Sequence, residues 1–217
     1  MFIGHFGLGM AAKKAAPNVS LGTLFIAFQF LDLVWPTLLL LGVEQVVIHP
    51  ELGGTRTFEF THYPITHSLA MVIVWSLLFG SIYWLVKRDT RSALVVGFGV
   101  LSHWLLDLIV HFHDLPLYPG NSPFAGFGLW ASVAGTLLVE CAIFVTGIIL
   151  YLRSTESTRT GRIVFWIIII LLALVQLSNF FAPAPENVKA LAWSGQFQWL
   201  FVALAYWADG RSSKLKA

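Results

Sequence analysis

The sequence predicts an all-α protein, a polytopic transmembrane helical bundle of about six spans preceded by a short N-terminal helix. Hydrophobic residues make up 57% of the chain and charged residues only 11%, whereas a soluble domain carries about 25% charged residues. The mean hydropathy of +0.77 agrees with a membrane protein. Apolar runs of the roughly 20 residues needed to cross a bilayer recur along the chain. The 217 residues are therefore expected to form a single integral membrane domain, 1–217.

The predicted spans are joined by short polar connections. They lie near residues 20–42, 64–86, 92–112, 127–151, 163–182 and 190–208. The last span has the weakest support, because Ser194, Gln196 and Gln198 interrupt its apolar pattern.

The segment at residues 2–12 is too short to cross a bilayer. Eleven helical residues reach about 16 Å, which is half of the hydrocarbon thickness. The segment is either a re-entrant half-helix that carries His5 toward the middle of the bundle or an interfacial helix in the headgroup layer. Spacing alone leaves both alternatives open.

Basic residues predict the orientation of the bundle. Eleven of the 13 lysines and arginines fall in every second connection. They form four clusters: Lys13 and Lys14; Lys87, Arg88 and Arg91; Arg153, Arg159 and Arg162; Arg211, Lys214 and Lys216. Because cytoplasmic loops are enriched in lysine and arginine, both termini and the basic tail at 209–217 are expected in the cytoplasm, with the protein in the inner or plasma membrane. These residues do not form a continuous basic patch, so no nucleic-acid partner is expected.

Histidine and aspartate residues are concentrated where the chain is otherwise apolar. In the third span, His103, Asp107 and His111 are spaced by four residues and share one helical face. They lie roughly 18, 24 and 30 Å from the cytoplasmic end of that span. Ionisable groups inside a bilayer cost several kcal/mol unless they pair, meet water or bind an ion.

Residues near two further spans are expected at a similar depth. Asp32 lies roughly 18 Å into the first span, His67 one turn inside the second, and His62 just outside it. These groups can converge in a cavity that opens on the non-cytoplasmic side. Imidazole and carboxylate groups form a typical ligand set for a divalent metal, above all zinc. The single cysteine excludes an internal disulfide and a cysteine-rich metal site.

The same residues also have explanations that need no metal. His103 and Asp107 can form a buried hydrogen-bonded pair, and His62 and His67 can cap a turn at Pro64. Those explanations require four or more ligand-type residues to share one leaflet by chance, so the metal site is the stronger hypothesis.

Three further residues are candidates for supporting roles. His113 and Asp114 follow the third span in a loop, where they are either solvated or, for Asp114, bonded to His111 so as to orient its ring. Glu140 lies in the middle of the fourth span, as either a protonated contact between helices or a group that lines the site.

Four short motifs resemble those of the YdjM-type inner-membrane proteins, which are described as membrane-bound metal-dependent hydrolases. The motifs are Gly4-His5, Leu31-Asp32-Leu33, Thr66-His67-Ser68-Leu69 and Ser102-His103-x-x-x-Asp107. The resemblance covers roughly residues 1–120, whereas 121–208 add generic spans.

The resemblance implies a ligand set. YdjM-type proteins are distantly similar to zinc-dependent phospholipases C and single-strand nucleases, which hold clustered zinc ions with an N-terminal histidine, an aspartate, further histidines and a His-x-x-x-Asp pair. Carried over, the ligand candidates are His5, Asp32, His62, His67, His103, Asp107 and His111. This chain lacks the family's second carboxylate after Asp32 and has Tyr63 where the family has an arginine that could contact an anionic substrate. It also lacks a second His-x-x-x-Asp/Glu pair, which a full three-metal cluster needs, so one or two ions are expected.

A membrane-bound metal-dependent hydrolase is the predicted function. The metal would activate a water molecule for attack on a lipid ester or phosphodiester, with membrane lipids as the partners. Asp32 and Asp107 are the candidate catalytic carboxylates, and Asp32 is a general base if it lies beside the metal-bound water. The alternatives are an ion- or proton-coupled transporter that uses the same cluster, and a non-catalytic scaffold with a structural metal.

Overall fold

The computed structural model is a helical bundle with five helices long and apolar enough to span a membrane. It describes residues 1–52 and 57–210, and the backbone of 212–214. Arg56, Arg211 and residues 215–217, part of the predicted basic tail, lie outside the described residues. The five helices are α2 (Leu21–Leu40), α3 (Leu69–Lys87), α4 (Thr90–Val110), α5 (Val133–Ser154) and α6 (Arg159–Phe181). The first five predicted spans are therefore confirmed as helices.

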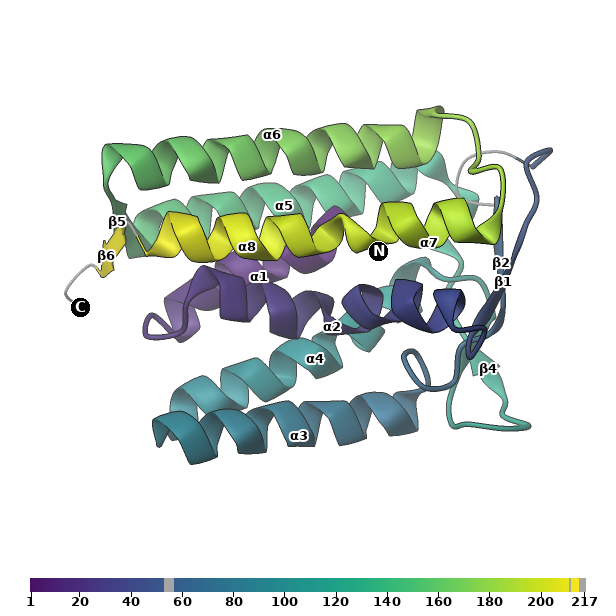
Figure 1. The fold of residues 1–217 in the computed structure, drawn as a ribbon, viewed down its shortest axis with the longest axis horizontal. Coiled ribbons are helices and arrows are strands. Elements are labelled where there is room, and N and C mark those ends of the chain that lie inside the picture. The colour runs from purple at the N-terminus through teal and green to yellow at the C-terminus, as the bar shows by residue number, and fades with distance from the viewer. Residues whose placement is uncertain (53–56, 211, 215–217) are drawn as a thin grey trace.

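The sixth predicted span is divided into two helices. α7 (Val188–Gln196) and α8 (Gln198–Asp209) meet at Phe197 and lie nearly in line (Figure 1). Residues 190–208 therefore do not form one continuous helix, because the polar side chains that interrupt the apolar pattern bind other elements. Gln196 donates to the Thr37 hydroxyl, and Gln198 donates to the main-chain carbonyl of Asp32.

Most of these helices begin at a residue whose side chain caps the first turn. The capping oxygen accepts a hydrogen bond from the backbone N–H three residues later, which satisfies a donor that the helix itself leaves unpaired. The caps are Ser20 for α2, Asp89 for α4, Ser132 for α5, Thr158 for α6 and Asn187 for α7. α3 ends at Arg88, whose positive φ of 53° turns the chain back into α4.

The short N-terminal helix, α1 (Ile3–Ala15), lies inside the bundle. It packs against α5, α2 and α4, and His5, Phe6 and Met10 are completely buried. Figure 1 shows its first residue near the middle of the bundle. This position agrees with the re-entrant alternative and not with a helix on the outer surface.

Two contacts with α5 fix the position of α1. Glu140 accepts hydrogen bonds from the backbone N–H groups of Phe2 and Gly4, 2.8 and 3.3 Å away, so a carboxylate faces the positive end of the helix dipole. Farther along, Gly7 and Gly147 bring the two backbones together. A Cβ atom at Gly147 would lie only 2.0 Å from the carbonyl oxygen of Gly7.

A buried ion pair ties the other end of α1 to the bundle. The Lys13 ammonium donates to both carboxylate oxygens of Asp209, at 2.9 and 2.8 Å, and to the carbonyl of Val19. Asp209 also accepts the backbone N–H of Leu21 at the start of α2. One carboxylate therefore joins α1, α2 and α8.

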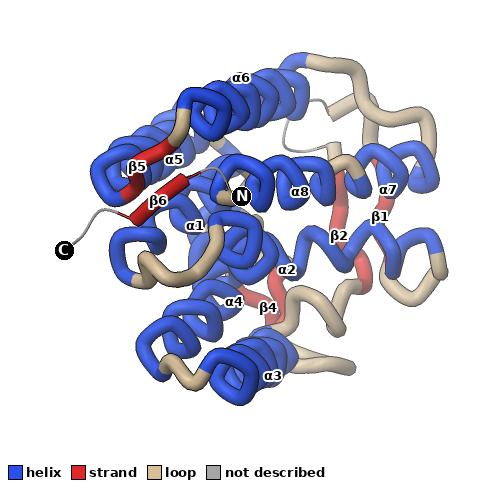
Figure 2. The backbone as a smooth tube through the Cα atoms, turned by 60° about the vertical axis from the view of Figure 1, so that its left-hand side comes forward, coloured by secondary structure: helices blue, strands red, loops and turns tan. Residues whose placement is uncertain are grey.

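The two ends of the bundle differ in their connections. Three short antiparallel pairs complete the fold: β1 (Gln45–Ile48) with β2 (Phe58–His62), β3 (Leu115–Pro116) with β4 (Phe124–Ala125), and β5 (Thr155–Ser157) with β6 (Ser212–Lys214). The α3–α4 turn and β5–β6 lie at one end, and β1–β2 lies at the opposite end (Figures 1 and 2). A single turn of 3₁₀ helix, η2 (Leu129–Ala131), precedes α5. The basic clusters at 87–91 and 153–162 therefore share one end of the molecule.

The outer surface of the bundle is apolar. Of the most apolar 18-residue stretch of α3, only 6% is buried. The exposed residues of α3 include Leu77, Leu85 and Val86. α6 likewise exposes Ile170 and Leu174. Soluble monomers rarely expose contiguous apolar surface of this kind, so these faces agree with contact to lipid.

Candidate metal centre

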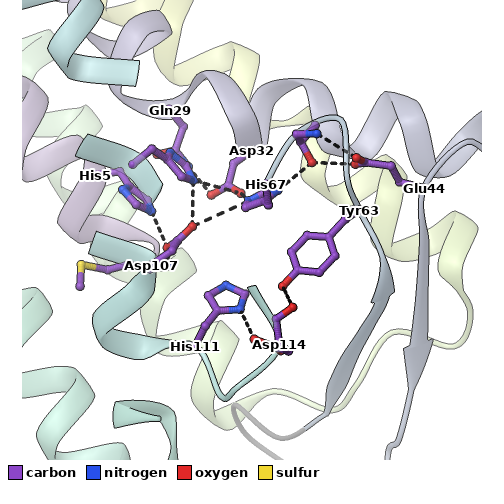
Figure 3. Close-up of polar contacts among 12 residues, drawn as sticks. His5, Gln29, Asp32, Glu44, Tyr63, His67, Asp107, His111 and Asp114 are labelled. Atoms are coloured by element: carbon purple, nitrogen blue, oxygen red, sulfur yellow. Dashed lines mark hydrogen bonds and ion pairs between the residues drawn. The ribbon is translucent and has the colours of Figure 1, made fainter. Parts of the chain in front are cut away.

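Four elements bring histidine and aspartate side chains together inside the bundle. α4 supplies His103 and Asp107, α2 supplies Asp32, α1 supplies His5, and His67 lies just before α3 (Figure 3). They form two overlapping groups whose ligand atoms lie within 4.8 Å of one another, His5–His103–Asp107 and Asp32–His67–His103. Both groups can hold a metal ion.

Four distances between histidine nitrogens and aspartate oxygens are close to those between neighbouring ligands of one metal ion. The Nε2 atom of His103 lies 3.2 Å from Asp107 Oδ2 and 3.6 Å from Asp32 Oδ1. The Nε2 atom of His67 lies 3.4 Å from Asp32 Oδ1 and 3.7 Å from Asp107 Oδ2. Neighbouring ligand atoms around a tetrahedral zinc ion with bonds of about 2.0–2.1 Å are about 3.3–3.4 Å apart. The four His–Asp distances therefore lie near this range, at 3.2–3.7 Å.

The protein fixes which nitrogen of His103 faces the carboxylates. Its Nδ1 lies 2.9 Å from the main-chain carbonyl oxygen of Phe28. Because a carbonyl only accepts hydrogen bonds, Nδ1 carries a proton and donates. Nε2 is buried and has no hydrogen-bond partner among the described residues. In the neutral ring, its lone pair points at Asp32 and Asp107.

A side-chain hydroxyl likewise fixes which ring nitrogen of His67 carries the proton. Its Nδ1 lies 2.7 Å from the Oγ1 atom of Thr66, and the Thr66 hydroxyl donates to Glu44 at 2.7 Å. A hydroxyl has one proton to donate, so Nδ1 of His67 is the donor to Thr66. The Nε2 atom of His67 therefore also faces Asp32 and Asp107.

This donor set fits a cation. Two imidazole lone pairs and two carboxylates in a buried space repel one another unless a proton or a metal ion lies between them. Metal-binding histidines commonly donate their other N–H to a protein acceptor, as both rings do here. The residues present are therefore suited to a divalent metal.

His5 contacts the outer side of Asp107. Its Nε2 lies 3.1 Å from Asp107 Oδ1, which also accepts a hydrogen bond from the Met1 ammonium group. The ring stacks on His103 with centroids 3.6 Å apart and planes at 7°. Asp107 thus directs Oδ1 toward α1 and Oδ2 toward His67 and His103.

A proline in α2 explains how α8 supports Asp32. Pro36 has no N–H, so the main-chain carbonyl of Asp32, four residues earlier, lacks its usual helical partner. Gln198 donates to that carbonyl at 3.2 Å. Gln29, completely buried, donates to Asp32 Oδ2 at 3.0 Å and to the side-chain oxygen of Gln198 at 2.6 Å. The break between α7 and α8 therefore holds the Asp32 segment.

His111 lies next to the two groups but belongs to neither. Its Nδ1 donates to Asp114 Oδ1 at 3.0 Å, and Tyr63 donates to the main-chain carbonyl of Asp114 at 3.0 Å. Burial lowers the pKa of His111, although Asp114 opposes the shift. Burial also raises the pKa of the Tyr63 hydroxyl, which remains a donor. Of the two alternatives for Asp114, the contact with His111 is the one that the structure contains.

The remaining predicted residues lie in different surroundings. His62 is exposed at the end of β2, where the hairpin partner of its backbone is Gln45, and it is in neither group. His113 is exposed in the loop after α4. Glu140, on α5, is buried against the start of α1 and also lines the cavity beside the site.

A cavity of about 620 Å³ lies beside the site. Asp32, His67, Asp107, His111 and Glu140 all line it. Its walls are largely aromatic and aliphatic and include Trp35, Phe58, Phe60, Trp130, Phe180, Leu191 and Phe197. A cavity lined by polar site residues on one part and by apolar side chains on the rest can hold a molecule with a reactive polar group and a hydrophobic body.

Glu44 was not among the predicted site residues. It follows the apolar run of α2, yet it is only 1% exposed. Its position as an isolated acid at the end of a span was a signal, but its link to His67 depends on how the segment at 64–68 folds back. Gln29, another polar residue inside α2, directly binds Asp32.

No family model, curated protein or solved structure matches this chain. The resemblance to YdjM-type proteins therefore stays a prediction, and the candidate site is defined by its own geometry.

Proposed function

We propose that this protein is a membrane-bound metal-dependent hydrolase. One observation carries the proposal: the nitrogens of His67 and His103 lie 3.2–3.7 Å from the carboxylate oxygens of Asp32 and Asp107, and Asp32, His67 and Asp107 line a largely apolar cavity. A cavity beside the ligands gives a substrate access to the ion, which a purely structural metal site does not need.

The ligand set supports one resident ion, with zinc as the best fit. The Nδ1 atom of His103 is already bound to Phe28, so its ring offers a single lone pair to the two overlapping groups. Two imidazoles and two carboxylates are common zinc ligands. His5 then stabilises Asp107 from the side that faces away from the ion.

The chemistry follows from the positions of the carboxylates. A bound zinc ion lowers the pKa of its water toward about 7 and polarises the ester or phosphoryl oxygen. The side chain of Asp32 is 23% exposed, whereas those of Asp107, His67 and His103 are 4% or less. Asp32 is therefore the carboxylate best placed to accept a proton from the attacking water. Gln29 holds its other oxygen in place.

The walls of the cavity favour a lipid substrate. Their aromatic and aliphatic side chains suit acyl chains, and the polar site residues suit an ester or phosphodiester. With the basic clusters in the cytoplasm, α7 and α8 together complete a sixth crossing, and the site lies in the non-cytoplasmic half of an inner or plasma membrane.

The packing below the site argues against the transporter alternative. A transporter needs access to its site from both sides of the membrane. Toward the basic end, α1 fills the bundle with Phe6 and Met10, which pack with Phe25 and Phe201 in one apolar core. Proton or ion flux into liposomes without lipid hydrolysis would support the transporter instead.

The test uses purified full-length protein in detergent. We expect about one zinc per chain and zinc-dependent hydrolysis of at least one member of a panel of lipid esters and phosphodiesters. His103→Ala should lose both the metal and the activity, whereas His113→Ala, in an exposed loop, should keep both. Metal at background in the wild type, or equal metal in His103→Ala, would refute the proposal.

A further inference from the structure

Another buried carboxylate, Glu44, lies behind His67, on the side away from the candidate ion. Glu44 is 1% exposed and stands in the connection between α2 and β1. Its Oε1 atom accepts the backbone N–H groups of Ile65 and Thr66, at 2.8 and 2.9 Å. Its Oε2 atom accepts the Thr66 hydroxyl at 2.7 Å. Each of the two oxygens is thus committed as an acceptor.

These contacts give the chain of hydrogen bonds a fixed direction. An ionised carboxylate can only accept, so the single hydroxyl proton of Thr66 must point at Glu44. The lone pairs of Thr66 are then available to His67, whose Nδ1 lies 2.7 Å away. The proton between these two atoms must therefore belong to Nδ1, and Nε2 is left with its lone pair.

We propose that Glu44 is a positioning residue that selects the metal-binding tautomer of His67 through Thr66. The inference rests on the proposed metal centre, in which Nε2 of His67 is a ligand. In many metal sites a carboxylate bonds the ligating imidazole directly. Here the Thr66 hydroxyl lies between Glu44 and His67 (Figure 3). Because it donates to Glu44, it can only accept from His67.

A purely structural role for Glu44 is the competing explanation, because Oε1 also holds the turn that begins at Pro64. Substitutions at Thr66 separate the two roles, since its backbone N–H reaches Glu44 whatever the side chain. Thr66→Ser keeps the hydroxyl, whereas Thr66→Val keeps the shape and removes it. Only the tautomer explanation predicts that these two variants differ in metal affinity.

Glu44→Gln provides the sharper test because it keeps size and shape. The two backbone N–H groups require the amide oxygen at the Oε1 position, which leaves the amide NH₂ at the Oε2 position. That NH₂ donates to Thr66, so the Thr66 hydroxyl proton turns to His67 Nδ1. His67 then favours the tautomer with a proton on Nε2, which cannot bind a metal. The direction of the hydrogen bonds that link residue 44, Thr66 and His67 would be reversed, although the turn stays intact.

The experiment measures zinc affinity by chelator competition on the purified full-length protein. Thr66→Val and Glu44→Gln should each weaken zinc binding by about 10–100-fold, and Thr66→Ser by no more than about two-fold. Melting temperatures of the metal-free variants should stay within about 3 °C of the wild type, a shift that corresponds to roughly 1 kcal/mol. Wild-type affinity in Glu44→Gln would show that Glu44 only holds the turn.

Nitrogen NMR of ¹⁵N-histidine-labelled, metal-free protein gives a readout that needs neither metal nor activity. The wild type should show His67 protonated at Nδ1, and Glu44→Gln should shift it toward Nε2. A wild-type His67 protonated at Nε2 would overturn the inference. If Glu44→Gln shifts the His67 tautomer as expected but no lipid is hydrolysed, the proposed function fails and the role of Glu44 stands.

Discussion

His67 and His103 each use one ring nitrogen to bind the protein and turn the other toward two aspartates. The acceptors differ, a hydroxyl for His67 and a carbonyl for His103, but the outcome is the same. Such outer contacts commonly set the affinity of a metal site. The contact of His103 joins residues 75 positions apart, and the direction of the Thr66–His67 contact depends on Glu44, 22 positions before Thr66, so the order of residues gave no indication of either.

The candidate residues that were predicted most accurately share a regular spacing. His103 and Asp107 are one helical turn apart, so their shared face followed from the helix period alone. His62 shows the limit of such reasoning. It was placed near His67 by sequence distance, but β2 carries its side chain to the exposed surface. When two residues are close in sequence but lie in an irregular connection, their spacing does not determine where their side chains point.

His111 provides a prediction for the pH dependence of stability. Its pKa is lowered by burial, so below the ordinary histidine value of 6.5 the unfolded chain binds a proton that the folded protein does not. This residue should therefore lower stability as the pH falls below about 6.5, and have no such effect well above it. Melting of metal-free wild type and His111→Gln from pH 5 to 8 checks this. Parallel curves over the whole range would contradict it.

At the scale of elements, long apolar runs were predictive and breaks were not. The runs of α2 to α6 fall close to the predicted spans, because about 20 apolar residues leave few alternatives. The break at Phe197 depends on Gln196 and Gln198 finding partners on α2. The burial of α1 depends on Gly7 meeting Gly147, a contact between distant residues.

The close approach of α1 and α5 leads to a prediction for Gly147→Val. A side chain there would collide with the backbone of Gly7, so α1 must shift and carry His5 away from Asp107. We expect a loss of about 1–3 kcal/mol in stability, together with weaker metal binding. Thermal melting and zinc titration in detergent measure both. Thr146→Val, at an exposed neighbouring position, is the control and should change neither.

The ion pair at the other end of α1 leads to a second prediction. The side chains of Lys13 and Asp209 are only 6% and 12% exposed, so removing one partner leaves an uncompensated buried charge. Lys13→Met should cost about 3 kcal/mol, and Lys13→Met with Asp209→Leu should cost less than the sum of the single changes. Chemical unfolding in detergent gives these values. Lys14→Met is the exposed control, and a loss equal to that of Lys13→Met would refute the pair's role.

At the scale of the whole molecule, the second half of the chain supports the site. Residues 121–217 were predicted only as generic spans. In the structure, Glu140 holds the start of α1, Gln198 holds the segment of Asp32, and Phe180 and Leu191 line the cavity. The partners of Glu140 and Gln198 were unpredictable from the sequence, because they lie more than 100 positions away.

The orientation of the whole bundle can be tested by labelling single cysteines. In a Cys141→Ser background, Glu51→Cys lies in the turn after β1 and Lys87→Cys at the last residue of α3, at opposite ends. Intact cells should allow a membrane-impermeant maleimide to label Glu51→Cys but not Lys87→Cys, which should react only after permeabilisation. The reverse pattern would place the site on the cytoplasmic side.

The most direct test of the metal centre is X-ray absorption at the zinc edge of the zinc-loaded protein. The structure predicts a shell of about four nitrogen and oxygen ligands at about 2.0–2.1 Å, with two imidazoles. His67→Ala and His103→Ala should each remove one imidazole or abolish binding. A shell of six oxygens without imidazole, or no zinc retained by the wild type, would contradict this centre.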